Sequence, residues 1–309
     1  MPRPAPDLAI VGATATGKTA LAVALAQRLD AEILSADSRQ LYRGMDIGTA
    51  KPTPTEQAAA RHWLIDIAAP DETVTLAAFL DLAESALRDM HARRKRAIVA
   101  GGTGQYVWSV IEGWRVPRVP PDPELRRTLE QLARAEGPGP LVEELRRSDP
   151  DSLARIDPRN VRRLIRALEV TRTTGRPFSA WQQREPAERA PTIIGLRLER
   201  AELHRRIDRR VERMIADGLI DEVRRLNASG YGCELPAMSG IGYRQVCEYL
   251  AGVVSLEDAV SRIKTETHRL ARIQHTWFKP RDTRIVWLEA DAPDLIERAA
   301  RVVAAQLLP

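Results

Sequence analysis

Residues 8–19 read Leu-Ala-Ile-Val-Gly-Ala-Thr-Ala-Thr-Gly-Lys-Thr, and this stretch decides the fold. Its first four residues form an apolar run that ends at a glycine, as a buried parallel strand does. Residues 12–19 match the pattern G-x-x-x-x-G-K-[ST], and alanine and leucine at helical spacing follow as far as Leu29. A strand, a glycine-rich turn and a helix in that order predict a loop that binds phosphate groups.

Each residue type in this loop has a physical role in holding phosphate. Glycines let backbone N–H groups turn inward around phosphate oxygens, and the following helix points its positive dipole end at the same oxygens. Lys18 adds a mobile positive charge, and the Thr19 hydroxyl is the expected ligand of Mg²⁺. A glycine-rich turn without a ligand is the alternative. The residues that we expect to surround a diphosphate or triphosphate are Gly12, Ala13, Thr14, Ala15, Thr16, Gly17, Lys18 and Thr19.

Further apolar runs alternate with helical patterns along the chain. Residues 31–36, 97–100, 192–198 and 285–288 read as strands, and residues 202–226 form one amphipathic helical pattern. This alternation predicts an α/β fold, a P-loop NTPase-like parallel sheet flanked by helices. In such a sheet, ligands bind at the carboxyl ends of the strands.

A proline-rich stretch at residues 116–123 marks a boundary, where the alternation of strands and helices gives way to another pattern. From there to about residue 184 the patterns are helical, and a polar, proline-rich stretch closes the segment. We therefore expect an all-helical insertion domain at 120–188. The core would be formed by residues 1–119 together with residues 189–309.

Composition places the chain of 309 residues among globular proteins, with 44% apolar and 29% charged residues. No apolar run approaches the roughly 20 residues of a membrane span, and residues 1–7 lack the apolar core of a signal peptide, so we expect a cytoplasmic protein. A monomer is the default expectation. Cys233 and Cys247 are too few for a disulfide framework or a four-ligand zinc site, and we predict two reduced thiols.

The distribution of charge points to an anionic partner. Residues 1–90 hold 8 Lys and Arg against 12 Asp and Glu, whereas the remainder holds 39 against 30. A basic remainder favours a nucleic-acid partner for the later segments. Only five of the 47 basic residues are lysines, so a general preference for arginine is the competing explanation.

One feature of ordinary P-loop enzymes is missing from the neighbouring strand. Kinases and ATPases of this class carry an apolar strand that ends in Asp and completes the Mg²⁺ site. The strand at 97–100 runs instead into Gly101-Gly-Thr-Gly104. A carboxylate does end the strand Ile33 to Asp37, so Asp37 is either a metal-supporting group or a base that faces the phosphate site.

Residues 35–52, Ser-Ala-Asp-Ser-Arg-Gln-Leu-Tyr-Arg-Gly-Met-Asp-Ile-Gly-Thr-Ala-Lys-Pro, closely resemble the signature of the bacterial tRNA dimethylallyltransferases, also called tRNA isopentenyltransferases. Further stretches resemble the family in the same order, at residues 62–66, 101–104, 162–169, 242–245 and 276–278. The chain differs at Ala13 and Thr16, where the family usually has Pro and Ser, and at His268 and Ile273, where relatives often carry basic residues.

The resemblance implies an activity, its substrates and its cofactor. Such enzymes transfer a dimethylallyl group from dimethylallyl diphosphate to N6 of the adenosine 3′-adjacent to the anticodon of tRNA, and they release diphosphate. The phosphate loop would hold the prenyl diphosphate with Mg²⁺, and any binding of ATP would be incidental. An adenylate isopentenyltransferase, a small-molecule kinase and a nucleotide-gated RNA-binding module are the alternative functions. The basic later segments favour tRNA.

The resemblance assigns catalytic roles to Asp37, Thr103 and Arg244. Asp37 would accept a proton or a hydrogen bond from N6, with Mg²⁺ support or a purely structural carboxylate as alternatives. Thr103 would touch the target nucleotide or the prenyl diphosphate, and a helix N-cap is its alternative role. Arg244 would neutralise the leaving diphosphate.

The predicted tRNA surface centres on residues 161–168. Val161, Leu164, Ile165 and Leu168 recur at helical spacing and form a buried stripe, which leaves three arginines as an exposed basic ridge. A solvated helix face is the alternative reading. The residues that the resemblance implies as tRNA contacts are Asp37, Ser38, Arg39, Gln40, Thr103, Arg126, Arg162, Arg163, Leu164, Ile165, Arg166, Gly242, Tyr243, Arg244 and Gln245.

Overall fold

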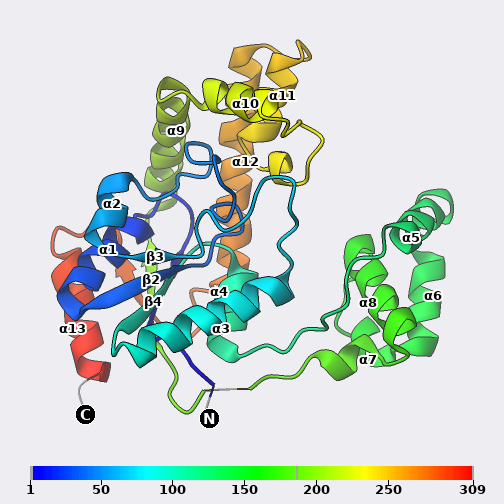
Figure 1. Ribbon diagram of the computed structural model, residues 1–309, viewed down its shortest axis with the longest axis horizontal. Coiled ribbons are helices and arrows are strands. Elements are labelled where there is room, and N and C mark those ends of the chain that lie inside the picture. The colour runs from blue at the N-terminus through cyan, green and yellow to red at the C-terminus, as the bar shows by residue number, and fades with distance from the viewer. Residues whose placement is uncertain (1–2, 186, 308–309) are drawn as a thin grey trace. The chain divides into compact units, whose positions relative to one another are not determined.

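Six parallel strands form one sheet, and five of them are the apolar runs of the sequence (Figure 1). The computed structural model describes residues 3–185 and 187–307. The strand order is β3-β2-β4-β1-β5-β6. The strand bounds are β1 Leu8–Gly12, β2 Ala31–Ser35, β3 His62–Trp63, β4 Arg96–Ala100, β5 Thr192–Arg197 and β6 Ile285–Glu289. In the central register, Ala9 lies opposite Val99 of β4 and Ile193 of β5. The predicted parallel α/β sheet is confirmed.

Helices cover the sheet and bury its central strands. The helices next to the strands are α1 Lys18–Leu29, α2 Pro54–Ala59, α3 Leu76–Ala92, α4 Gly104–Glu112 and α13 Leu295–Leu307. Figure 1 shows α13 beside α1, and both contribute to one apolar core with the strands. Leu25 of α1, Ile10 of β1 and Ala299 of α13 are fully buried there. Burial of this surface is the main favourable term in folding the sheet.

Four further helices gather at one end of the sheet (Figure 1). Their bounds are α9 Arg200–Ala216, α10 Leu219–Ala228, α11 Tyr243–Leu250 and α12 Leu256–Trp277, with a 3₁₀ turn η2 at Ala237–Ser239. The single helix predicted over 202–226 is wrong, because Gly218 adopts a left-handed backbone with φ of 100° between α9 and α10. Glycine accepts this conformation without the steric cost that other residues meet.

A disulfide joins Cys233, which follows α10, to Cys247 of α11. The prediction of two reduced thiols is therefore wrong. The chain between them folds back through η2, which brings the two Cα atoms to 5.9 Å, a normal spacing for a bridge. The two cysteines are 14 residues apart in the sequence, and this spacing alone does not predict that the chain folds back to bring them together.

The chain divides into two compact units, with boundaries between Ile111 and Glu112 and after Glu185. We call residues 112–185 the helical unit and the rest the sheet unit. The elements of the helical unit are α5 Pro123–Glu136, α6 Gly139–Ser148, α7 Pro150–Leu153, α8 Val161–Thr174 and a 3₁₀ turn η1 Phe178–Trp181. Its core contains the fully buried side chains of Leu141, Leu164 and Leu168.

The helical unit starts and ends earlier than the expected 120–188. Its two ends pair through backbone hydrogen bonds, from Arg115 N to Gln183 O and from Glu185 N to Gly113 O, each 2.8 Å long. The proline-rich stretch therefore belongs to the helical unit, although the sequence suggested a domain boundary there. None of the helices in the described ranges is long and apolar enough to cross a membrane.

Candidate active site

Three loops meet at the carboxyl edge of the sheet because β2, β4 and β1 are adjacent parallel strands. The phosphate loop, residues 12–17, follows β1, and Asp37 follows β2. Thr103 follows β4, and its N–H donates to the carbonyl of Ala36 over 3.2 Å. The strand order therefore brings Asp37 and Thr103, which are far apart in the sequence, to the edge that carries Lys18.

The phosphate loop keeps its shape through contacts inside the loop. The buried Thr16 hydroxyl donates to Ala13 O over 2.8 Å, and Lys18 Nζ donates to the same carbonyl over 2.6 Å. Gly17 forms the left-handed N-cap of α1, which directs the positive end of the helix dipole at the loop. The predicted strand, loop and helix are thus all present in the geometry that binds phosphate oxygens.

Two cations and one carboxylate share this edge. Burial and, to a smaller extent, the neighbouring Arg210 lower the pKa of the Lys18 amine, Asp37 opposes both, and the resulting pKa is about 8. Arg210, on α9, donates from Nη1 to Thr14 Oγ1 over 3.3 Å. Burial also lowers the pKa of Arg210, and Asp37 again opposes the shift. Two partly buried cations and one carboxylate thus lie together beside the loop.

Thr103 fastens the turn after β4 to the loop that carries Asp37. Its Oγ1 accepts the N–H of Ser38 over 3.0 Å and lies 3.4 Å from Ser38 Oγ. The first-turn amides of Tyr106 and Val107 donate to the Thr103 carbonyl and not to its hydroxyl. The Thr103 backbone thus stands at the N-cap position of α4, but its hydroxyl is used by Ser38 and does not cap the helix. Asp37 Oδ1 accepts the N–H of Arg39 over 2.9 Å, which fixes the carboxylate on its own turn.

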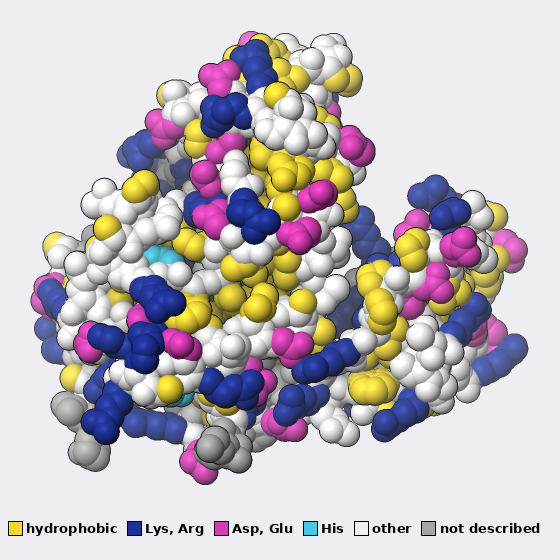
Figure 2. Space-filling view, viewed as in Figure 1, with side chains coloured by type: hydrophobic (Ala, Val, Ile, Leu, Met, Phe, Trp, Pro, Cys, Tyr) yellow, Lys and Arg dark blue, Asp and Glu magenta, His cyan; other side chains and the backbone are white. Residues whose placement is uncertain are grey.

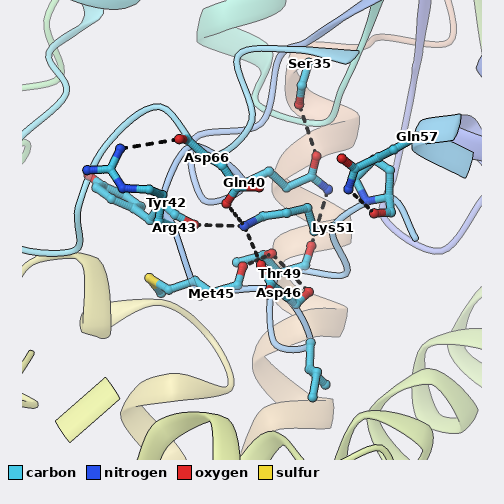
Figure 3. A network of polar contacts seen from close by, with 12 residues as sticks. Ser35, Gln40, Tyr42, Arg43, Met45, Asp46, Thr49, Lys51, Gln57 and Asp66 are labelled. Atoms are coloured by element: carbon cyan, nitrogen blue, oxygen red, sulfur yellow. Dashed lines mark hydrogen bonds and ion pairs between the residues drawn. The ribbon is translucent and has the colours of Figure 1, made fainter. Parts of the chain in front are cut away.

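The segment that follows Asp37 is pinned from within, as Figure 3 shows. Lys51 is almost fully buried, and its Nζ contacts Asp46 and Asp66 at 2.5 Å each and Tyr42 O at 2.9 Å. The Gln40 side chain is also buried: its Oε1 accepts from Ser35 Oγ over 3.1 Å, and its Nε2 donates to Ala50 O over 3.1 Å. Both polar atoms of the Gln40 side chain thus form hydrogen bonds inside the protein. This differs from the expectation that Gln40 contacts tRNA.

Glu222 of α10 fastens the same segment to the helices beyond the sheet. Its carboxylate, only 2% exposed, accepts backbone N–H groups of residues 46, 47 and 48 over 3.0, 2.8 and 3.2 Å. It also accepts the Tyr243 hydroxyl over 2.6 Å. Burial and this carboxylate raise the pKa of Tyr243. Successive backbone N–H groups can form an anion-binding site, and here the Glu222 carboxylate accepts their hydrogen bonds.

Several predicted tRNA contacts lie in this internal network instead. Arg39 donates to Pro236 O and Ala237 O of the turn before α11 over 3.2 and 3.1 Å. Tyr243 and Gln245 are each 1% exposed, and Gln245 Oε1 accepts the Gly242 N–H over 2.9 Å. Arg39 thus holds the turn before α11, and Tyr243 and Gln245 lie on the buried face of α11. The expectation that side chains touch RNA is wrong for the buried Tyr243 and Gln245, and it stays a prediction for the partly exposed Arg39.

The arginine that contacts the phosphate loop is Arg210 rather than Arg244. Arg244 lies on α11, where its guanidinium pairs with Glu266 at 2.6 Å and with Glu248 at 4.0 Å. Nothing in the sequence singles out Arg210, because it is one of several arginines along the polar side of α9. Its burial and its contact with Thr14 identify it only once the fold is known.

The basic ridge of the helical unit is narrower than predicted. Arg162 and Arg163 are exposed, but Arg166 donates to Glu169 at 2.5 Å and to Val119 O at 3.0 Å. Arg126 binds the same fully buried Glu169 through two hydrogen bonds of 2.7 Å. Burial alone would raise the pKa of Glu169, but these hydrogen bonds outweigh it and hold the pKa below its ordinary value. Arg126 and Arg166 are therefore held by a carboxylate of their own unit, and their contact with tRNA stays a prediction.

Leu164 and Ile165 belong to the core of the helical unit, as their place in the apolar stripe predicts. Their side chains are 0% and 4% exposed and do not reach RNA. In Figure 2, the Lys and Arg side chains of the visible face are interspersed with Asp and Glu. No broad surface of one sign is therefore seen on that face.

Within the described ranges, no group of three or more His, Cys, Asp or Glu side chains is arranged to hold a metal ion. Mg²⁺ needs six oxygen ligands and often takes several of them from substrate phosphates and water. The residues present fit binding of Mg²⁺ together with substrate phosphates, because Thr19 lies in the first turn of α1, directly after Lys18 and next to the phosphate loop. A magnesium ion would therefore arrive with a diphosphate.

Comparison with known proteins places this geometry in context. A family model described as IPP transferase matches residues 40–281. The chain is 52% identical over 298 residues to the tRNA dimethylallyltransferase of Roseiflexus castenholzii, covering 96% of this chain and 97% of that protein. It is also 52% identical over 287 residues to the tRNA dimethylallyltransferase of Chloroflexus aggregans, covering 93% and 97%.

Solved structures give the same result. The full-length tRNA isopentenylpyrophosphate transferase of Bacillus halodurans is 38% identical, with a TM-score of 0.70 over 97% of this chain and 96% of that one. A eukaryotic dimethylallyltransferase crystallised while acting on tRNA has a TM-score of 0.77 over 96% of this chain and 78% of its own. At 24% identity, this second likeness shows the fold alone.

Proposed function

Since the chain belongs to the IPP transferase family, we propose that it transfers a dimethylallyl group from dimethylallyl diphosphate to N6 of the adenosine 3′-adjacent to the anticodon of tRNA. One observation carries this proposal beyond family membership. The Asp37 carboxylate lies at the same sheet edge as the phosphate loop and acts electrostatically on both Lys18 and Arg210. A base thus faces the site where the leaving group would be held.

The diphosphate is held by the loop amides, Lys18 and Arg210. As the bond between C1 of the prenyl group and the diphosphate oxygen breaks, its electron pair leaves with the diphosphate, and negative charge grows there. Cations fixed in a site that excludes water stabilise such charge without reorganisation. Magnesium, when bound with the diphosphate beside Thr19, supplies further positive charge to the leaving group.

The amine nitrogen forms the new bond. The lone pair of adenine N6 is delocalised into the ring, so the amine becomes a better nucleophile when a carboxylate accepts one of its protons. Two contacts support this role for Asp37: its Oδ1 accepts the Arg39 N–H, and the contact between Ser38 and Thr103 holds the loop. N6 bonds to C1 of the prenyl group, diphosphate leaves, and the N6 proton passes to Asp37.

The nucleotide reaches this edge as part of an RNA loop. Unpaired anticodon-loop bases are the ones that proteins extrude most easily, because little stacking is lost. Arg162 and Arg163 of the helical unit are the exposed members of the predicted ridge and are proposed to contact RNA phosphates. We also propose that the protein acts in the cytoplasm, where tRNA is found, as a monomer.

One assay separates this function from its alternatives. The protein is incubated with Mg²⁺ and dimethylallyl diphosphate together with either tRNA or AMP, and the digested products are analysed by mass. Prenylated adenosine from tRNA alone supports the proposal. Product from AMP alone indicates an adenylate isopentenyltransferase. Phosphoryl transfer from ATP without prenylated product indicates a kinase, and tRNA binding without any product indicates a binding module.

A further inference from the structure

The carboxamide of Gln274 lies between the phosphate loop and the turn after β4. Gln274 is near the end of α12 and is 7% exposed. Its Oε1 accepts the Thr14 N–H over 2.7 Å, and its Nε2 donates to Gly102 O over 3.0 Å. One side chain thus satisfies both loops, and it comes from a helix near the far end of the chain.

The contact with Gln274 requires a residue without a side chain at position 102. A Cβ atom at residue 102 would lie 2.3 Å from Gln274 Nε2 and 3.8 Å from Lys18 Nζ. The absence of a side chain at residue 102 therefore lets the carboxamide approach the turn. The packing around the loop supports the same arrangement, because Ala271 of α12 and Ile207 of α9 pack against Ala13.

We propose that Gln274 is a positioning residue for the diphosphate site. By holding Thr14 and Gly102 together, it sets the spacing between the loop that binds the diphosphate and the turn that carries Thr103. The inference rests on the proposed function only for the identity of the ligand. The contact with Thr14 also commits one backbone N–H of the loop to α12, so that the shape of the loop does not depend on a bound phosphate.

Two variants remove the carboxamide contact by different routes. Gln274→Met keeps the length and burial of the side chain but loses both hydrogen bonds. Gly102→Ala leaves Gln274 in place and displaces only the flexible end of its side chain. Thr276→Ala is the matched control, because Thr276 is exposed at the end of the same helix and its hydroxyl donates only to Ile273 O.

Calorimetry with inorganic diphosphate and Mg²⁺ should show affinity about 10- to 100-fold weaker in each of the first two variants, the range expected for losing two buried hydrogen bonds. In the prenyl-transfer assay, KM for dimethylallyl diphosphate should rise by a similar factor. Affinity for tRNA should stay close to that of the parent, whereas the thermal midpoint should fall, because buried hydrogen bonds inside the protein are lost. The double variant should lose less than the product of the two single effects, because both act on one contact.

Unchanged diphosphate affinity in both variants overturns the proposal. So does an equal fall in diphosphate affinity and tRNA affinity, which makes Gln274 a general packing residue. The calorimetric measurement requires no chemistry. A protein that does not prenylate tRNA therefore refutes the proposed function without deciding the role of Gln274, which diphosphate binding decides separately.

Discussion

The hydroxyl of Tyr243 donates to the carboxylate of Glu222 over 2.6 Å, and both side chains are at most 2% exposed. Through this pair, α10 and α11 hold the backbone of residues 46–48, which belongs to the segment that begins at Asp37. The shape of the loop that follows the proposed base therefore depends on helices from the far end of the chain.

Tyr243→Phe should lower the free energy of unfolding by about 1.5–3 kcal/mol, because a hydrogen bond to a buried charged group is removed. Glu222→Leu should cost more, since it leaves three backbone N–H groups without their acceptor. Urea denaturation measures both effects. Tyr249→Phe on the same helix is the control, because Tyr249 is only partly buried. Equal stability of the two Phe variants would show that the Glu222 contact contributes nothing.

Binding of diphosphate should depend on pH through Lys18. The amine has a pKa of about 8 in the folded protein, against 10.5 when exposed, because burial disfavours its charge. Bound diphosphate favours the charged amine, so affinity should be level below about pH 8 and should fall above it. The measurement is a series of calorimetric titrations between about pH 6.5 and 9.5, a range that brackets that value.

Lys18→Arg is the companion to that series, because its guanidinium stays charged throughout. Ionisation of the diphosphate itself affects both proteins alike, so the difference between their profiles reports on residue 18. Parallel profiles would exclude titration of Lys18 in this range.

Arg210→Ala should reduce turnover by about 10²–10³-fold, the usual cost of removing a group that stabilises charge on a leaving group. Diphosphate binding should weaken as well. Arg209→Ala is the matched control, since Arg209 is the exposed neighbour on the same helix. Arg244→Ala tests the assignment made from the sequence: a larger loss there than at Arg210 would restore Arg244 as the group that neutralises diphosphate.

Asp37→Asn keeps the shape of the side chain and a carbonyl acceptor but does not take up a proton. A positioned general base contributes about 10²–10⁴-fold to a rate, so single-turnover prenyl transfer should fall within that range. Asp37→Ala should fall further, while tRNA affinity stays near that of the parent because phosphate contacts supply most of it. A small loss in Asn beside a large loss in Ala would make Asp37 a hydrogen-bond acceptor only.

The arginines of α8 should separate into two classes. Replacing Arg162 and Arg163 with alanine should weaken tRNA binding and reduce its log–log salt slope by about one for each RNA phosphate that is no longer bound. Arg166→Ala should instead lower the stability of the protein by about 1–3 kcal/mol, because the buried Glu169 is deprived of a partner. A salt slope that changes only with Arg166 would reverse these assignments.

The sequence predicted those parts of the fold that depend on local patterns. The strand from Leu8, the phosphate loop and the helix from Lys18 lie where the pattern places them, since short-range periodicity and turn chemistry determine them. The family signature around Asp37 likewise identified the second loop at the sheet edge. In each case the information lies within a short run of consecutive residues.

The misplaced residues depend on contacts between distant segments. Arg210 and Arg244 look alike in the sequence, and only the packing of α9 against the phosphate loop distinguishes them. Arg166 reads as an exposed residue, yet a buried Glu169 three positions later turns it inward. Tyr243 belongs to a family motif, and the motif alone does not say whether its role is in binding or in packing.

The pairing between residues 113–115 and 183–185 has a consequence for how the chain folds. β5 must find β1 although the whole helical unit is synthesised between them. If the helical unit folds first, its own ends come together, and the chain segments before and after it start close to each other, as though joined by a short turn. The entropic cost of closing the loop formed by the helical unit is then offset by the folding of that unit, during synthesis and before the sheet forms.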